Sequence, residues 1–107
     1  MSEDGTDTDG PTSTQFIDLV MKADSLLDSN PEKAIVFYEQ ALEPPRSGSP
    51  RLVIHALRQK ADAHIHLDQP AEAKTALGEA YTLALAAELD LEQREIEHLM
   101  VDLMVIG

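Results

Sequence analysis

The apolar residues of this chain recur every three or four positions in five successive segments, which is the spacing of one face of an α-helix. The segments span residues 14–27, 31–43, 50–67, 70–87 and 90–106. None alternates apolar and polar residues as a half-buried strand would, and no Asn-Gly or Asp-Gly turn joins two apolar runs. The pattern therefore predicts an all-α protein of about five helices.

Residues with strong positional preferences mark the helix borders. Asn30 and Ser49 each precede a proline, which pairs an N-cap residue with a proline at the first helical position. The Pro44-Pro45 pair cannot donate helical hydrogen bonds, so the second helix must end before it. Asp90 with Gln93 has the spacing of a capping box, which predicts the start of the last helix.

Two parts of the chain repeat each other. The triplet 22–24 (Lys-Ala-Asp) recurs at 60–62, and Ala34, three residues after a proline, returns as Ala73. Alanines at such positions let two helix axes approach closely, while larger neighbours fill the grooves. The repeat predicts two similar antiparallel hairpins, 14–43 and 50–87, followed by a closing helix at 90–106.

The spacing of small and aromatic residues in both hairpins resembles the tetratricopeptide repeat family, over roughly residues 15–87. The matching positions are Ala23, Ala34, Tyr38 and Ala41 in the first unit and Ala61, Ala73, Leu77 and Ala80 in the second. In the second unit Leu77 stands where the family usually has an aromatic residue, which is a departure from the pattern. The resemblance implies a short right-handed superhelix of stacked hairpins. A three- or four-helix bundle of the microtubule-interacting-and-trafficking type is the alternative.

The resemblance also implies that the first helices of successive hairpins line a concave groove that binds a helix or an extended segment. Its expected lining is Val20, Asp24 and Leu27 from the first helix, Arg58, Asp62 and Ile65 from the third, and Glu95 from the fifth. A subgroup of the family grips acidic chaperone tails, but Asp24 and Asp62 would repel a carboxylate. We therefore expect a basic, partly apolar partner segment. The alternative is that both aspartates pair with nearby lysines or face water.

The spacing of apolar residues also predicts which faces of the third and fifth helices turn inward. The third is expected to turn inward Leu52, Leu57, Ala61, His64 and Ile65, and the fifth Ile96, Leu99, Met100, Leu103 and Met104. The other face of the fifth helix carries Val101, Val105 and Ile106. These three either pack under the chain or form a contact surface, and a homodimer through them is a further hypothesis.

The net charge of the chain favours some classes of partner over others. The chain of 107 residues, a length typical of one domain, has 20 acidic and 8 basic side chains and a formal charge of −12. Such a charge repels phosphate backbones, which disfavours nucleic acid, and favours basic partners; it also serves solubility by itself. Residues 1–13 are acidic and almost devoid of apolar side chains, which predicts a disordered tail.

Several functional classes lack their signatures in this sequence. It has no cysteine, no glycine-rich phosphate loop, no signal peptide and no apolar run long enough for a bilayer. His64 and His66 point about 200° apart on a helix, so they cannot chelate one ion together, while His55 and His98 have no evident carboxylate partner. We predict a soluble cytoplasmic protein that is not an enzyme and has no metal, cofactor or membrane contact.

Three functions fit these expectations. The first is a protein-binding adaptor or scaffold that holds a partner segment in the groove. The second is a structural subunit that assembles through the closing helix. The third is an acidic antagonist that occupies a basic protein by mimicking nucleic acid. The mimic requires carboxylates spaced along one outer face, whereas here they are scattered along the chain.

Overall fold

The computed structural model describes residues 13–43 and 49–106. These residues form five α-helices and no strand: α2 (Ser13–Leu26), α3 (Pro31–Ala41), α4 (Pro50–His66), α5 (Pro70–Ala86) and α6 (Asp90–Ile106). The all-α prediction is confirmed, with borders close to those expected. The predicted tail lies outside the described residues except for Ser13, where α2 begins, and so does the Pro44-Pro45 pair.

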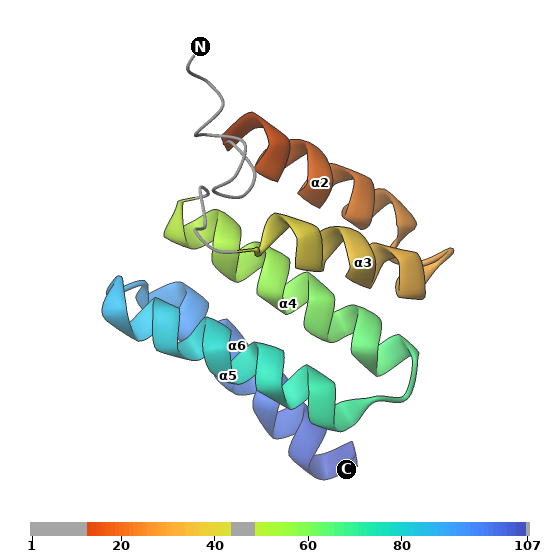
Figure 1. The fold of residues 1–107 in the computed structure, drawn as a ribbon. Helices are drawn as coiled ribbons and strands as arrows, with labels where there is room; N and C mark the ends of the chain where they lie inside the picture. Colours follow the sequence, from red (N-terminus) through yellow and green to blue (C-terminus); the bar gives the residue numbers. More distant parts are fainter. Residues whose placement is uncertain (1–12, 44–48, 107) are drawn as a thin grey trace.

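Each helix packs against the next one along the chain. The most extensive contacts are within the pairs α2–α3 and α4–α5, and thinner contacts join α3 to α4 and α5 to α6. Figure 1 shows α2, α3, α4 and α5 following one another across the molecule, with α6 lying behind α5. The described chain is therefore two helical hairpins and a closing helix.

Local capping explains where two of the helices start. The Asn30 side chain accepts a hydrogen bond from the backbone N–H of Lys33 (3.2 Å), and the Ser49 hydroxyl accepts one from the N–H of Leu52 (3.4 Å). Each cap satisfies one of the donors that an α-helix leaves free in its first turn. Both predicted N-caps are confirmed.

The alanines of the two units are buried together in one core. Those at the repeat positions, Ala23, Ala34, Ala41, Ala61, Ala73 and Ala80, are all at most 1% exposed. The largest fully buried side chains around them are Tyr38, Phe16, Ile54, Leu57, Leu77 and Ile96. Equivalent positions of both hairpins thus face the interior, as the repeat predicts.

The expected inner face of α4 requires correction. Leu52 and Ile65 are each 36% exposed, whereas Val53, Ile54 and Ala56 are buried. α4 packs against α3 on one side and α5 on another, so its buried arc is wider than one amphipathic stripe and is centred elsewhere.

Gly78 and Glu88 are residues that local energetics disfavour at their backbone positions. Gly78 lies inside α5, and a Cβ there would meet no atom within 4 Å. Glu88 follows α5 with φ 57°, and the next residue, Leu89, donates its N–H to the carbonyl of Ala84 (2.9 Å), as in a Schellman motif.

We expect Gly78→Ala to raise the free energy of unfolding by about 0.5–1 kcal/mol, because alanine loses less backbone entropy in a helix. Glu88→Gly should raise it by a similar amount, about 1 kcal/mol, because glycine adopts positive φ without a Cβ clash. Urea unfolding followed by circular dichroism measures both. A lower stability of the Gly78 variant would mean that the position contacts something the described chain does not provide.

Candidate functional site

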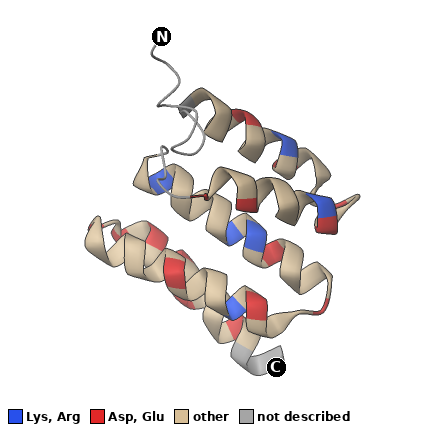
Figure 2. Cartoon of the chain, viewed as in Figure 1, with Lys and Arg blue, Asp and Glu red and all other residues tan. Residues whose placement is uncertain are grey.

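Helix α4 contributes basic side chains to ion pairs that link neighbouring helices. Four of its basic side chains meet a carboxylate from another helix: Arg51 with Glu92 (3.2 Å), His55 with Asp24 (3.0 Å), Arg58 with Glu95 (3.0 Å) and Lys60 with Glu39 (3.5 Å). In Figure 2 the blue segments of α4 lie in the middle of the stack, with red segments on neighbouring helices. α4 is therefore linked by charge to α2, α3 and α6.

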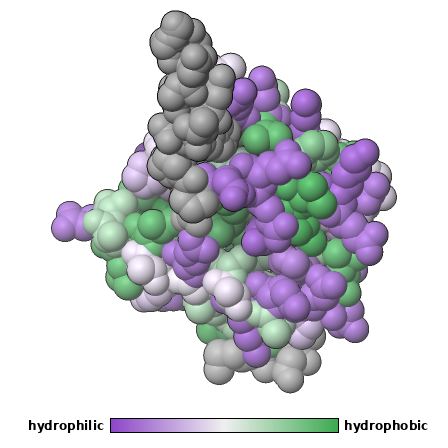
Figure 3. Space-filling model, viewed as in Figure 1, coloured by the Kyte–Doolittle hydropathy of each residue, from purple (hydrophilic) through white to green (hydrophobic). Residues whose placement is uncertain are grey.

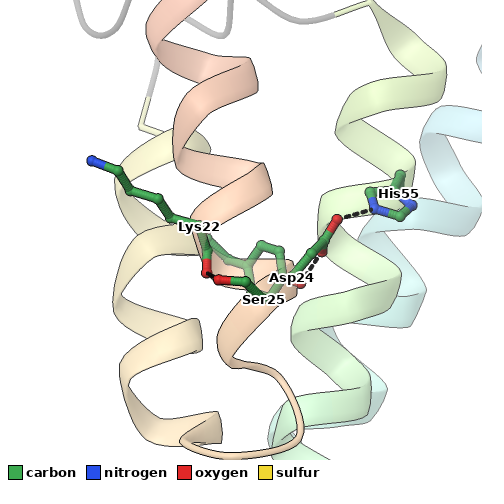
Figure 4. Close-up of polar contacts among 5 residues, drawn as sticks. Lys22, Asp24, Ser25 and His55 are labelled. Atoms are coloured by element: carbon green, nitrogen blue, oxygen red, sulfur yellow. Dashed lines mark hydrogen bonds and ion pairs between the residues drawn. The ribbon is translucent and has the colours of Figure 1, made fainter.

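One carboxylate of this set joins three helices. Asp24 of α2 accepts a hydrogen bond from the Tyr38 hydroxyl of α3 with one oxygen, and its other oxygen lies 3.0 Å from Nε2 of His55 on α4. Figure 4 shows Asp24 reaching from α2 toward the His55 ring. Burial, together with the hydrogen bond to Asp24 and the negative charges of Asp24 and Asp62, raises the pKa of Tyr38 far above its ordinary value. Tyr38 therefore stays a neutral donor to Asp24.

A second histidine stands near the C-terminal end of α4. Nδ1 of His66 is 2.8 Å from the backbone carbonyl oxygen of Asp62 and 3.9 Å from its carboxylate. The hydrogen bond to the Asp62 carbonyl, followed by the charges of Asp62 and Asp28, raises the pKa of His66 above its ordinary value. The carboxylates of α2 and α4 thus favour the imidazolium form.

The structure divides the predicted groove residues into two groups. Val20 and Leu27 are buried, with 5% and 8% of their surface exposed, and belong to the core. They offer a partner almost no surface, so they are removed from the candidate site. The remaining residues, Asp24, Arg58, Asp62, Ile65 and Glu95, keep part of their side chains exposed.

These remaining residues share one side of the molecule. Asp62 and Ile65 lie four and seven residues after Arg58, which places all three on one side of α4. The Asp24–His55 and Arg58–Glu95 pairs bring α2 and α6 alongside. Ile17, seven residues before Asp24, is exposed on the same side of α2. We call this surface the α2–α4–α6 face; its members are Ile17, Asp24, Asp28, Arg51, His55, Arg58, Asp62, Ile65, His66, Glu92 and Glu95.

The closing helix packs mainly as predicted. Ile96 and Leu103 are buried, and the Tyr81 hydroxyl of α5 donates a hydrogen bond to Glu97 (2.9 Å). The Gln93 side chain donates to the carbonyl of Ala84 (3.3 Å) and so serves the end of α5. This side-chain hydrogen bond runs to α5 and not to Asp90, the partner that the capping-box spacing predicts.

The predicted dimer surface is described only in part. Val101 is 55% exposed on α6, while the side chains of Val105, Ile106 and Met104 lie outside the described residues. Homodimerisation through this helix stays a hypothesis.

His64 is buried, and its Nδ1 lies 2.7 Å from the Gln69 side-chain oxygen, which agrees with the expected core or rim position. His55 has a carboxylate partner that sequence analysis missed, because Asp24 is 31 residues away. Among the side chains that the structure describes, no three of the types that commonly bind metals gather at one point.

A separate hollow lies elsewhere, along α2. It has a volume of about 350 Å³ and is lined by Gln15, Asp18, Leu19 and Lys22. Among the residues that the structure describes, the lining of this hollow comes from a single helix, and we place the candidate site on the α2–α4–α6 face, where side chains of different helices meet.

Comparison with protein-family models, curated proteins and solved structures finds no match for this chain. The tetratricopeptide resemblance therefore stays a prediction from the residues. Within the described ranges, none of the helices is both long enough and apolar enough to cross a bilayer.

Proposed function

We propose that this protein is a non-catalytic interaction module of tetratricopeptide-like architecture that docks a basic, partly apolar segment of another protein on its α2–α4–α6 face. The observation that carries the proposal is the gathering of Asp24, Asp62 and Glu95, from three helices, on one side of the molecule beside the exposed Ile65.

The packing of the hairpins supports this architecture. Ala34 and Ala73, at equivalent positions of α3 and α5, are both fully buried. Helices can approach closely where only alanine lies between them. The ion pairs of α4 with α2 and with α6 keep the first helices of the successive units adjacent, as a stack of repeats requires.

The charge of the face supports a cationic partner. With neutral histidines, the arginines Arg51 and Arg58 face a larger number of carboxylates, Asp24, Asp28, Asp62, Glu92 and Glu95. Long-range attraction then speeds the encounter with a basic segment. Many of these charges already have partners, and exposed ion pairs contribute little net affinity, so apolar contacts must supply much of the binding energy.

Apolar anchor points lie at both ends of the face. Ile65 borders a hollow of about 50 Å³ together with Pro70 and Leu103, and Ile17 is 43% exposed on α2. Figure 3 has the viewpoint of Figure 1, in which α6 lies behind α5, and on that side of the molecule separate apolar patches lie between hydrophilic side chains. On the α2–α4–α6 face, the exposed isoleucines and the carboxylates match a partner that alternates basic and apolar residues.

Calorimetric titration with two synthetic peptides tests the proposal. One peptide has a helical pattern of lysine and leucine, and the other has glutamate in place of lysine. We expect the lysine peptide to bind at about 150 mM salt, where long-range attraction is largely screened, and the glutamate peptide not to bind. Asp62→Lys should weaken binding roughly five- to tenfold, the effect of reversing one ion pair.

Asp18→Lys is the matched control. Asp18 is exposed on α2, about 120° around the helix from Asp24, and its reversal changes the net charge by the same amount. We expect it to leave the affinity within about twofold. Equal losses in the two variants would show that the peptide responds only to net charge, and no loss in either would place the binding site elsewhere.

A further inference from the structure

Two histidines stand between the carboxylates of the α2–α4–α6 face. Nε2 of His55 lies 3.0 Å from Asp24, and Nδ1 of His66 lies 3.9 Å from the Asp62 carboxylate. Both imidazoles are 43% exposed, so protons and a partner can reach them. The proposed docking surface therefore contains its own titratable cations.

Asp24 shows how such a cation competes with a partner. One of its oxygens is taken by the Tyr38 hydroxyl, so His55 occupies the oxygen that remains. A neutral His55 leaves the pair with the negative charge of the carboxylate. A protonated His55 cancels that charge, and a lysine or arginine of a partner then has less to gain.

Charged and polar groups from three other helices surround the two histidines. From α2, Asp24 and Asp28 face the pair; from α3, Tyr38 stays neutral; from α6, Glu92 and Glu95 are bound to Arg51 and Arg58. Carboxylates and guanidinium groups keep their charges between about pH 5.5 and 7.5, whereas imidazole ordinarily changes charge within this range.

We propose that His55 and His66 make the α2–α4–α6 face pH-sensitive: in their protonated forms they neutralise Asp24 and Asp62 and weaken the docking of a cationic segment, and the His55–Asp24 pair then also tightens the contact between α2 and α4. This inference rests on the proposed function, because it concerns regulation of the same surface.

The two effects of protonation have opposite signs. A folded state that binds the proton more tightly than the unfolded chain is stabilised below the ordinary histidine pKa, and it loses that stabilisation as pH rises through the higher pKa of the folded state. The raised pKa of His66 has this direction. Stability from His66 is thus greatest where docking is weakest.

The experiment compares binding of the lysine–leucine peptide at about pH 5.5 and about pH 7.5, a range in which lysine stays protonated. We expect the affinity of the wild-type protein to be about three- to tenfold lower at the acidic pH, corresponding to one or two surface ion pairs. The double variant His55→Gln, His66→Gln should show less than a twofold difference. His98→Gln, an exposed histidine beside Glu97 and Val101 on α6, should retain the wild-type difference.

Urea unfolding at the same two pH values provides a readout that needs no partner. On going from the higher to the acidic pH, the urea midpoint of the wild-type protein should rise relative to the midpoint of the double glutamine variant. If the wild-type protein binds the peptide with the same affinity at both pH values, the pH inference is overturned and the proposed function is not. Absence of binding at either pH would overturn the proposed function and this inference with it.

Discussion

Tyr38→Ala lowers the free energy of unfolding by about 3–5 kcal/mol, the range found when buried aromatic side chains are truncated. Tyr38 is fully buried, and its ring fills the space between α3 and its neighbours while its hydroxyl reaches Asp24. Truncation leaves a cavity and removes the donor of a part-buried carboxylate. Because a domain of this size has a total stability of only about 5–15 kcal/mol, urea unfolding should show a variant that is close to the limit of folding.

Tyr38→Phe separates the hydroxyl from the ring. It keeps the packing but leaves Asp24 without its tyrosine donor, and we expect a loss of about 1–2 kcal/mol. Tyr81→Phe is the matched control, because the Tyr81 hydroxyl donates to Glu97 at an exposed site. That change should stay within about 0.5 kcal/mol. Equal losses for the two phenylalanine variants would show that Asp24 gains nothing from the three-helix arrangement.

Enlarging the alanines of the repeat produces the second large effect. Ala34→Leu and Ala73→Leu should each cost about 1–3 kcal/mol or more, because added methylene groups force closely packed helices apart. Both alanines have no exposed surface. Similar losses at the two positions would be expected of equivalent units. Thermal unfolding followed by circular dichroism measures each loss.

Ala71→Leu and Ala86→Leu provide the controls, because both alanines are exposed on α5. Leucine is nearly as good a helix former as alanine, so these changes should alter stability by less than about 0.5 kcal/mol. A leucine tolerated at Ala34 but not at Ala73 would contradict the equivalence of the hairpins and weaken the tetratricopeptide-like interpretation.

Features controlled by neighbours in the chain were predictable from the residues. Asn30 and Ser49 cap the helices that follow them, since a cap depends on a hydrogen bond spanning three residues. The buried alanines were predictable for a related reason: their spacing marks one face of each helix, and only small residues allow a close crossing.

The polar contacts of the face were not predictable in the same way. Asp24 and His55 are 31 residues apart and meet only because α2 lies beside α4. From the residues alone, Asp24 is expected in the groove that faces a partner, or else paired with a lysine or facing water, and His55 has no evident carboxylate partner. Val20 and Leu27, expected in an open groove, are core residues, because α2 turns that side toward the rest of the stack.

Taken by itself, the sequence determined the helical class, the borders of α3 and α4 and the small residues at which helices come close, since each depends on interactions within a few residues or on one periodic stripe. Only the tertiary structure decided which side of α4 is buried and which charges share a surface. Those outcomes depend on how several helices are rotated about their axes against one another, and a rotation of a few tens of degrees exchanges a core residue for an exposed one.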